Sequence, residues 1–456
     1  MIDYLQIKDY ISKNKNEIVN TLIELIKIPS ISDTPYVKEL CEHLKKLYSE
    51  NDLIIEEGKE YLLAHCGNGI RTIGLFCHGD VVPASNDWTA CKPFDPVVIG
   101  DNLFGRGSID NKSAIAMSLF VVKMLKELNI PLKSKLTTFV GFSEETSMCD
   151  IKEYAKSNTP PDFSLVLDAG FPVYLGDKGI LWLNCQKKER FENLISLNGG
   201  DAVNIILKTA EARVKYSLSL YEELKENKTL DISKEGSEIL IKAEGISNHG
   251  AMPEGSLNAG FIILDALLNA NSFSTHDKEI LKPIASLLSE YYGKELDICS
   301  SDECFGKTTC TNGIISIQNG EIYFTLDIRY GSTYTHQGLL DKIESYMYKL
   351  GYEIKVIKDG EPKAESIDNK YVIACMNTYR EHTKNYECKP RINAGGTYSR
   401  YLSNAIETGT TTKYDSCSLP AGHGQAHQPD EHISIEGLLE ATEIITKMIL
   451  SCDDIE

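Results

Sequence analysis

Hydrophobic residues recur with different periods in different parts of the chain, and these periods predict its organisation. In the first 180 or so residues, amphipathic helical segments alternate with short apolar runs, a pattern typical of an α/β sheet. Residues 16–28 place their aliphatic side chains on one helical side, and this helix stops at Pro29. The predicted buried strands are residues 71–77, 135–142 and 163–167, and a long buried helix is predicted over 113–128.

The middle of the chain, from about residue 180 to about residue 365, has a different texture. Long charged helices and strands of alternating polarity, such as residues 237–243 and 320–329, predict a separate α+β domain. The last 90 or so residues return to Gly-rich loops and end in a helix over 435–450. We therefore expect an α/β domain made of residues 1–180 and 366–456, interrupted by an inserted α+β domain of residues 181–365.

Composition and charge narrow the class of protein. The 456 residues are 42% hydrophobic and 25% charged, as in ordinary soluble globular proteins. A formal net charge of −19 disfavours nucleic acid and anionic lipid as partners. The chain shows no secretory signal and no run of ~20 apolar residues. Its 13 cysteines form no paired framework, which favours free thiols in a reducing compartment. We expect a cytoplasmic protein that binds neither nucleic acid nor membranes.

Polar clusters follow the predicted strands, where α/β proteins bind their ligands. His78-Gly79-Asp80 follows the first strand, and residues i and i+2 of an extended segment point the same way. Asp80 can therefore hydrogen-bond the far nitrogen of a metal-bound His78. Taken alone, the same pattern also fits a histidine with a purely structural role.

Three further clusters add carboxylates and a second histidine. Asp110 follows two glycines and precedes the long helix, so it fits either a helix N-cap or a carboxylate aimed into a cleft. Glu144 and Glu145 leave a buried strand together, which is costly unless a cation meets them. Asp168 follows the third strand, and His427 lies in a Gly-rich loop. Together these residues suit a pair of zinc ions.

In this order, the segments resemble the co-catalytic di-zinc exopeptidases of the aminoacylase and carboxypeptidase clan. The resemblance is greatest to the bacterial dipeptidase V branch, which is related to carnosinases, and it runs from about residue 10 to about residue 450. It implies a zinc-exopeptidase-type α/β catalytic domain interrupted by an inserted α+β lid domain. The segments that carry it are HGDVVPAS, GRGSIDNKSA, GFSEET, LDAGFP and AHQPDE.

The resemblance also implies a metal centre with assigned roles. Its ligands would be His78 and Asp168 for one ion, Glu145 and His427 for the other, and Asp110 as the bridge. Asp80 would orient His78, Glu144 would be the general base, and the peptide bond after Asp110 would be cis. Two divalent ions are expected, with zinc favoured and Mn or Co fitting the same ligands.

The implied activity is metal-dependent hydrolysis of unblocked dipeptides, by a hydroxide that bridges the two ions. His249 resembles the lid histidine that binds the substrate carbonyl oxygen, and Arg329 resembles the arginine that binds the substrate carboxylate. Asn204, Gly395 and Gly396 match further substrate contacts. Apart from the resemblance, His249 also fits a surface loop residue, and Arg329 fits a structural ion pair.

Two other functions fit the same motifs. One is an N-acyl-amino-acid deacylase of the desuccinylase or aminoacylase type, and the other is an inactive homologue kept for binding. The dipeptidase is favoured over the deacylase because Glu144 and Asp168 could meet a free ammonium group, and over the inactive homologue because no ligand is missing. We expect a monomer, and the sequence does not name the preferred dipeptide side chains.

Overall fold

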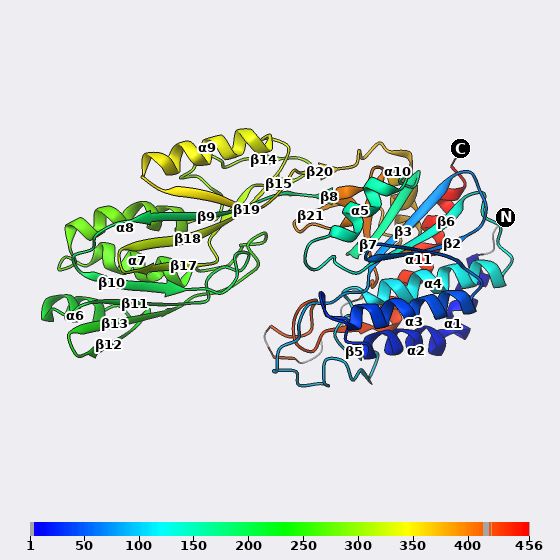
Figure 1. Ribbon diagram of the computed structural model, residues 1–456, viewed down its shortest axis with the longest axis horizontal. Helices are drawn as coiled ribbons and strands as arrows, with labels where there is room; N and C mark the ends of the chain where they lie inside the picture. The colour runs from blue at the N-terminus through cyan, green and yellow to red at the C-terminus, as the bar shows by residue number, and fades with distance from the viewer. Residues whose placement is uncertain (1–3, 414–418, 421, 456) are drawn as a thin grey trace. The chain divides into compact units, whose positions relative to one another are not determined.

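The computed structural model describes residues 4–413, 419–420 and 422–455. The chain divides into two compact units (Figure 1). The first unit comprises Met1–Asp177 and Ala364–Glu456, and the inserted unit comprises Lys178–Lys363. An α/β unit interrupted by an inserted α+β unit is the predicted fold class, which is thereby confirmed.

A mixed sheet runs through the first unit in the order β1-β2-β6-β3-β7-β22-β8, and its four strands β6, β3, β7 and β22 are parallel to one another. The strands of this sheet are β1 (Ile54–Gly58), β2 (Tyr61–Cys66), β3 (Thr72–His78), β6 (Lys135–Gly141), β7 (Phe163–Ala169), β8 (Tyr174–Asp177) and β22 (Ala405–Gly409). Two further short strands, β20 (Lys363–Ala364) and β21 (Arg391–Asn393), belong to the same sheet and pair with β8, whereas β4 (Val97–Ile99), β5 (Asn102–Phe104) and β23 (His432–Ser434) form a separate three-stranded sheet. The helices of the unit are α1 (Tyr4–Lys13), α2 (Lys15–Lys27), α3 (Tyr36–Glu50), α4 (Lys112–Glu127), α5 (Cys149–Ser157), α10 (Lys370–Thr383), α11 (Ile435–Asp453) and the 3₁₀ helix η1 (Tyr398–Tyr401).

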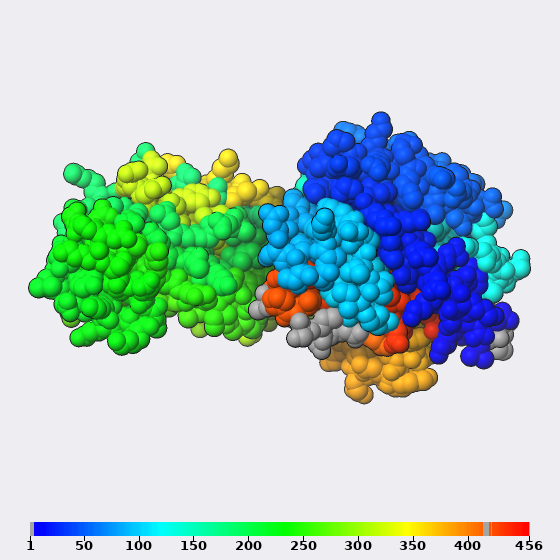
Figure 2. All heavy atoms as spheres, turned by 90° about the horizontal axis from the view of Figure 1, so that it is seen from below, coloured from blue at the N-terminus to red at the C-terminus, as the bar shows by residue number. Residues whose placement is uncertain are grey.

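Alternating side chains of the central strands feed two separate cores. Leu75 and Cys77 of β3 belong to the larger core, to which α1–α4, α10 and α11 contribute. Phe76, between them, belongs to a smaller aromatic core with residues of α5 and η1. The N-terminal helices lie on the outer surface of the unit (Figure 2). Both faces of the parallel strands are therefore covered, which explains why these strands read as continuous apolar runs.

The parallel arrangement fixes where the polar clusters meet. β3 and β6 pair in register so that His78 lies opposite Gly141, and β3 also pairs with β7. The carboxyl ends of the three strands therefore lie at one edge of the sheet. The predicted helix over 113–128 corresponds to α4, which begins beside this edge. Among the described residues, no helix is both long and apolar enough to cross a membrane.

The inserted unit is built on an antiparallel sheet in the order β12-β13-β11-β10-β17-β18-β9-β19. Its strands are β9 (Gly179–Lys188), β10 (Leu194–Gly199), β11 (Thr209–Lys215), β12 (Leu230–Glu235), β13 (Glu238–Glu244), β14 (Ser301–Asp302), β15 (Gly306–Lys307), β16 (Thr309–Thr311), β17 (Ile315–Gln318), β18 (Glu321–Tyr330) and β19 (Glu353–Gly360). Its helices are α6 (Leu218–Lys225), α7 (Ala259–Asn269), α8 (Thr275–Leu288) and α9 (His336–Lys349).

Strand β18 shows the alternation expected of a sheet with one apolar face. Phe324, Leu326 and Ile328 pack in the core of the inserted unit with residues of its four helices. Asp327 and Arg329, between and after them, lie outside this core. The predicted alternation over residues 320–329 is therefore seen in the structure, and it sets two charged side chains on the polar side of β18.

Candidate metal centre

The predicted metal-site residues of the first unit meet at the carboxyl edge of its sheet. His78 is the last residue of β3, Asp168 lies near the end of β7, and Glu144 and Glu145 follow β6. Asp110 comes two residues before α4 and is followed by a cis peptide bond to Asn111, as expected. His427 arrives from a loop far along the chain, and its Nε2 lies 3.1 Å from Glu145 Oε2.

Asp110 occupies the centre of this cluster because its two carboxylate oxygens face different histidines. Oδ1 lies 2.9 Å from His78 Nε2, and Oδ2 lies 3.0 Å from His427 Nε2. One carboxylate thus contacts both imidazoles, one with each oxygen, and the bridging role predicted for Asp110 stays a prediction.

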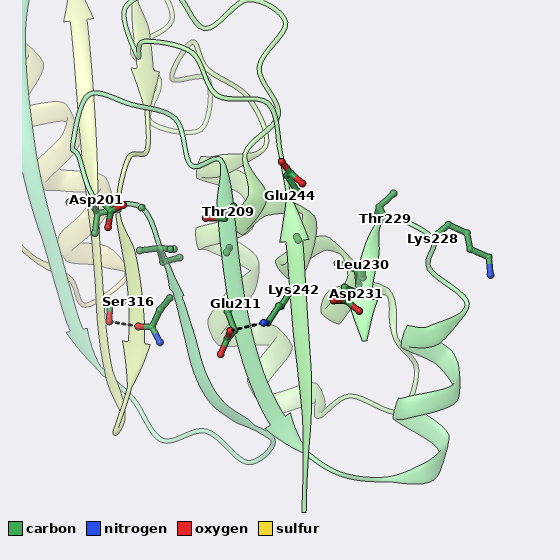
Figure 3. Close-up of a pocket in the computed structure, with 17 residues that line it drawn as sticks. Asp201, Thr209, Glu211, Lys228, Thr229, Leu230, Asp231, Lys242, Glu244 and Ser316 are labelled. Carbon is green, nitrogen blue, oxygen red and sulfur yellow. Dashed lines mark hydrogen bonds and ion pairs between the residues drawn. The ribbon is translucent and has the colours of Figure 1, made fainter. Parts of the chain in front are cut away.

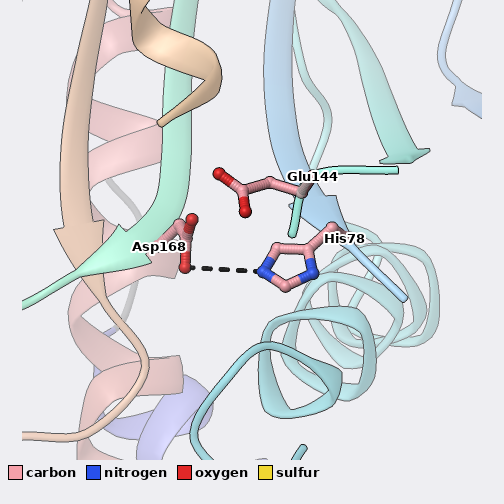
Figure 4. Close-up of side chains that lie close together, drawn as sticks. All are labelled: His78, Glu144 and Asp168. Atoms are coloured by element: carbon pink, nitrogen blue, oxygen red, sulfur yellow. Dashed lines mark ion pairs between the residues drawn. The ribbon is translucent and has the colours of Figure 1, made fainter. Parts of the chain in front are cut away.

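Two groups of three side chains each bring one possible ligand atom within 4.8 Å of the others. The first group is His78, Glu144 and Asp168, with His78 Nε2 3.8 Å from Asp168 Oδ1 (Figure 4). The second group is His78, Asp110 and Glu145. Figure 4 shows the Glu144 carboxyl group next to both Asp168 and the His78 ring. By distance alone, Glu144 could therefore serve as a ligand as well as a base.

Asp80 contacts His78 through its main chain as well as through the predicted carboxylate. Nδ1 of His78 lies 3.0 Å from the main-chain oxygen of Asp80 and 3.4 Å from its Oδ1. The Asp80 carboxylate also accepts hydrogen bonds from the main-chain N–H groups of Glu144 and Glu145, both at 3.2 Å, and from the Ser32 hydroxyl. Asp80 thus fixes the loop of the paired glutamates as well as the His78 ring.

The electrostatics of the cluster show a deficit of positive charge. Burial raises the pKa of Glu144, and the nearby Asp168 raises it further. Burial and Asp110 raise the pKa of Glu145 to about 7. Although burial opposes it, hydrogen bonds to Asp110 and Glu145 raise the pKa of His427 to about 11. Buried carboxylates that meet mainly one another and two imidazoles form a donor set suited to divalent zinc, manganese or cobalt.

One residue that the sequence did not single out joins two of the strand ends. The Asn111 side chain accepts a hydrogen bond from the main-chain N–H of His78 at 3.2 Å. Its amide donates to the main-chain oxygen of Leu167 at 2.6 Å and to Asp168 Oδ1 at 3.2 Å. In the sequence, only its position directly after Asp110 points to this role, because an amide that bonds mainly to main-chain atoms belongs to no recognisable sequence motif.

In the inserted unit, the structure brings Asn204 and His249 together. Their side chains approach at 3.3 Å, and the main-chain N–H of Gly250 donates to the main-chain oxygen of Asn204 at 2.8 Å. A Cβ atom on Gly250 would lie 2.9 Å from Asp327 Oδ2, so this loop packs against the charged residues of β18. Arg329 donates to Asp327 from Nε at 2.6 Å and from Nη2 at 3.1 Å. The ion pair weighed as the alternative for Arg329 is therefore present.

Gly395 and Gly396, in contrast, belong to a loop of the first unit between β21 and η1. The main-chain N–H of Gly395 donates to the Asn393 side chain at 2.9 Å. Thr397, directly after Gly396, donates its main-chain N–H to Asp177 at 3.3 Å. Neither glycine is a member of the two carboxylate and histidine groups.

A hollow of the inserted unit contains none of these groups. It has a volume of about 880 Å³ and opens over β10, β11 and β13 (Figure 3). Glu211 and Lys242 form an ion pair of 3.7 Å in it, and both side chains are about half exposed. None of the predicted site residues lines it among those described. The volume of this hollow is therefore no evidence that it is a catalytic or metal-binding site.

Comparison with known proteins settles the family. Residues 74–451 match the Peptidase family M20/M25/M40, which is well over half of the chain. The chain belongs to this family. It is therefore a metallopeptidase, and the resemblance to di-zinc exopeptidases is confirmed.

Individual relatives agree with this assignment. A Staphylococcus aureus protein named "Putative dipeptidase" is 25% identical over 97% of this chain and 98% of its own length. Human carnosine dipeptidase 1 has a similar fold, with a TM-score of 0.61, 14% identity and 99% of both chains covered. Aminoacylhistidine dipeptidase from Vibrio alginolyticus gives a TM-score of 0.58 at 13% identity, with 95% of this chain and 96% of that chain covered.

Proposed function

We propose that this metallopeptidase hydrolyses unblocked dipeptides. The observation that carries the proposal is the placement of Asp110 between His78 and His427, at 2.9 and 3.0 Å, inside a cluster of buried carboxylates. The names of the S. aureus relative and of the two dipeptidases with a similar fold support this substrate class.

Two divalent ions, with zinc favoured, would complete the centre. His78 and Asp168 would hold one ion, Glu145 and His427 the other, and Asp110 would contact both. The donor set fits because carboxylates and neutral imidazoles are the ligands that these metals prefer. When bound, the ions would lower the pKa of a water molecule and polarise the peptide carbonyl group.

Glu144 would carry the proton. Its carboxyl group lies beside His78 and Asp168, and its pKa is raised by burial. A carboxyl group with a raised pKa can take a proton from the attacking water and return it to the leaving amine. The Asp80 carboxylate, bound to the main-chain N–H groups of Glu144 and Glu145, would keep this base in place.

Residues of the inserted unit would recognise the substrate. Asp327 fixes the plane of the Arg329 guanidinium through two hydrogen bonds, and a fixed guanidinium is suited to a carboxylate group. His249, oriented by the Ala251 main-chain N–H at 3.1 Å, would contact the substrate carbonyl oxygen. Asn204, together with Gly395 and Gly396 of the first unit, would provide further contacts.

The charge at the two ends of a dipeptide separates this proposal from the deacylase. A free ammonium group would meet Glu144 and Asp168, whereas an N-acyl group would leave these carboxylates without a counter-charge. Sites that bind a charged group reject analogues that lack it, by a factor that can reach ~10⁴.

The test is hydrolysis by the metal-loaded protein of a dipeptide, its N-acetyl form, the tripeptide extended at the amino end, and N-succinyl amino acids. We expect kcat/KM for the free dipeptide to exceed that for each of the others by at least ~10²-fold. Equal or faster cleavage of an N-acyl substrate would replace the dipeptidase with the deacylase. The expected monomeric state stays a prediction that sedimentation analysis would check.

A further inference from the structure

A second buried ion pair lies behind the metal centre, and neither partner faces the substrate or a proposed ion. Glu431 and Arg106 are 0% and 1% exposed, and Arg106 Nη1 donates to Glu431 Oε2 at 2.5 Å. They lie 325 residues apart in the sequence. Glu431 follows the His427 loop, and Arg106 lies in the loop that leads to Asp110. The pair therefore joins the two loops that supply these side chains.

The other oxygen of Glu431 organises the backbone that carries Asp110. Oε1 accepts three hydrogen bonds from main-chain N–H groups: Gly107 at 3.1 Å, Ile109 at 2.9 Å and Asp110 itself at 3.1 Å. The main-chain oxygen of Glu431 also accepts a hydrogen bond from the Gly105 N–H at 2.9 Å. One side chain thus fixes the turn from which the Asp110 carboxylate projects.

Arg106 completes the link to the other loop. Its Nη2 donates to the main-chain oxygen of His427 at 3.2 Å, and its guanidinium lies 5.6 Å from the centre of the Trp88 ring. His427 adopts a left-handed backbone conformation with φ of 65°, which a non-glycine residue keeps only when its surroundings impose it. The hydrogen bond from Arg106 to its oxygen is one such constraint.

We propose that Glu431 and Arg106 are positioning residues that set the distance between Asp110 and His427, and thereby the affinity of the centre for its metal ions. The inference rests on the proposed metal site. Residues that orient metal ligands from behind typically affect metal affinity or activity by 10- to 100-fold, although they touch no ion. Because Asp110 faces both histidines, losing this support should weaken the binding of both ions.

The ion pair has a further consequence for charge. A carboxylate oxygen can accept several N–H groups at once, so one atom of Glu431 holds the backbone of Gly107, Ile109 and Asp110. Without a partner, the Glu431 carboxylate would add one more negative charge beside the buried carboxylates of the metal centre. Arg106 cancels that charge at 2.5 Å, so the backbone is fixed without adding net charge beside the site.

The chain contains a matched control for this role. Asp277, in the inserted unit, is also fully buried and also accepts three main-chain N–H groups, from Glu192, Asn193 and Leu194 at 2.7 to 2.8 Å. It does the same structural work without touching a loop of the metal centre. Asp277→Asn therefore reports what a buried carboxylate of this kind contributes to stability alone.

The experiment compares zinc binding by the full metal-free chain, by Glu431→Gln and by Asp277→Asn, using competition with a zinc-chelating dye. Glutamine keeps an oxygen for the backbone but turns an N–H group toward Arg106. We expect Glu431→Gln to weaken zinc binding by at least ~10-fold and Asp277→Asn to leave it within ~2-fold, while both lower the unfolding temperature. Unchanged zinc affinity in Glu431→Gln, or an equal loss in Asp277→Asn, would overturn the inference.

A second variant covers the case in which Glu431→Gln does not fold. Arg106→Lys keeps the positive charge but cannot donate to both Glu431 and the His427 oxygen in the same way. Weaker zinc binding is expected, and wild-type affinity in this variant would also overturn the proposal. Absence of zinc binding by the unaltered chain is a separate result, because it would overturn the proposed function itself.

Discussion

In the inserted unit, the buried carboxylate of Asp327 meets a cation from its own strand, Arg329, and also accepts a hydrogen bond from Trp182 at 2.8 Å. In the first unit, Asp110 and Glu145 meet two imidazoles and each other, and no lysine or arginine forms an ion pair with either among the described residues. Both regions bury charge, but of these carboxylates only Asp327 has an arginine beside it as a permanent counter-charge.

The difference indicates where an external cation belongs. A buried carboxylate without a partner is costly, so either its pKa rises or a cation binds. Burial raises the pKa of Glu144 and Glu145, which is the response of a centre that needs positive charge. Asp327 needs no such ion, because Arg329 already pairs with it.

Metal removal should give the largest effect, because it takes the cations from the metal centre and leaves the Asp327–Arg329 ion pair unchanged. We expect dialysis against a strong chelator to abolish peptide hydrolysis and to lower the unfolding temperature, since an ion that binds only the folded state stabilises it by ~2.7 kcal/mol at 100 times its Kd. Calorimetry with and without added zinc, manganese or cobalt measures this. An unfolding temperature that does not respond to these ions would contradict the charge deficit.

Glu144→Gln should give the next largest effect. The variant loses the group that carries the proton, so we expect kcat to fall by ~10²-fold or more with the bound metal nearly unchanged. Glu145→Gln is the matched neighbour, and it should lose metal as well as activity because Glu145 would be a ligand. Elemental analysis of both variants decides the assignment: metal loss in Glu144→Gln would make Glu144 a ligand and remove its role as the base.

Arg329 tests the other side of the comparison. If its guanidinium receives the substrate carboxylate, Arg329→Ala should reduce the preference for a free dipeptide over its C-terminal amide by ~10-fold or more. The variant also leaves Asp327 buried without its cation, which costs stability. Arg329→Lys keeps the charge and serves as the control. An unaltered preference in both variants would confine Arg329 to its ion pair.

The sequence predicted contacts that depend on side chains better than contacts that depend on main-chain atoms. Apolar runs located β3, β6 and β7, and the order of the motifs identified the family. The polar clusters could be placed together because side chains at the ends of parallel strands share one edge of the sheet. The roles of Asn111 and Glu431 were not predicted, since most of their partners are main-chain atoms, which leave no trace in a sequence pattern. The same holds for the main-chain oxygen of Asp80, which lies closer to His78 Nδ1 than the predicted carboxylate does.

A smaller effect is expected at a second carboxylate pair of the first unit, neither member of which belongs to the two carboxylate and histidine groups. Asp177 and Glu407 are fully buried, and the single Ser399 hydroxyl lies within hydrogen-bond distance of both, at 3.2 and 2.6 Å. Asn393 donates to Glu407 at 2.9 Å, and Arg400 lies 3.8 Å from Asp177. Burial raises the pKa of Asp177 to about 6, and burial together with Asp177 raises the pKa of Glu407.

The sign of the pH dependence follows from these directions. A carboxyl group whose pKa is higher in the folded state stabilises the fold most below its unfolded pKa of about 4, and that contribution is lost as the pH rises through the folded value. Asp177 should therefore weaken the fold between about pH 4 and pH 6, with Glu407 continuing the loss above that range.

Glu407→Gln puts a permanent N–H donor beside Asp177 and removes one of the two titrations. We expect the unfolding free energy of this variant, relative to the natural chain, to rise by about 1 to 2 kcal/mol between pH 4 and pH 7. Urea unfolding at several pH values measures it, with the exposed Glu321→Gln as the control that should show no such trend. Parallel curves for Glu407→Gln and the natural chain would mean that Glu407 keeps its ordinary pKa, and that Arg400 already balances this pair in the way that Arg329 balances Asp327.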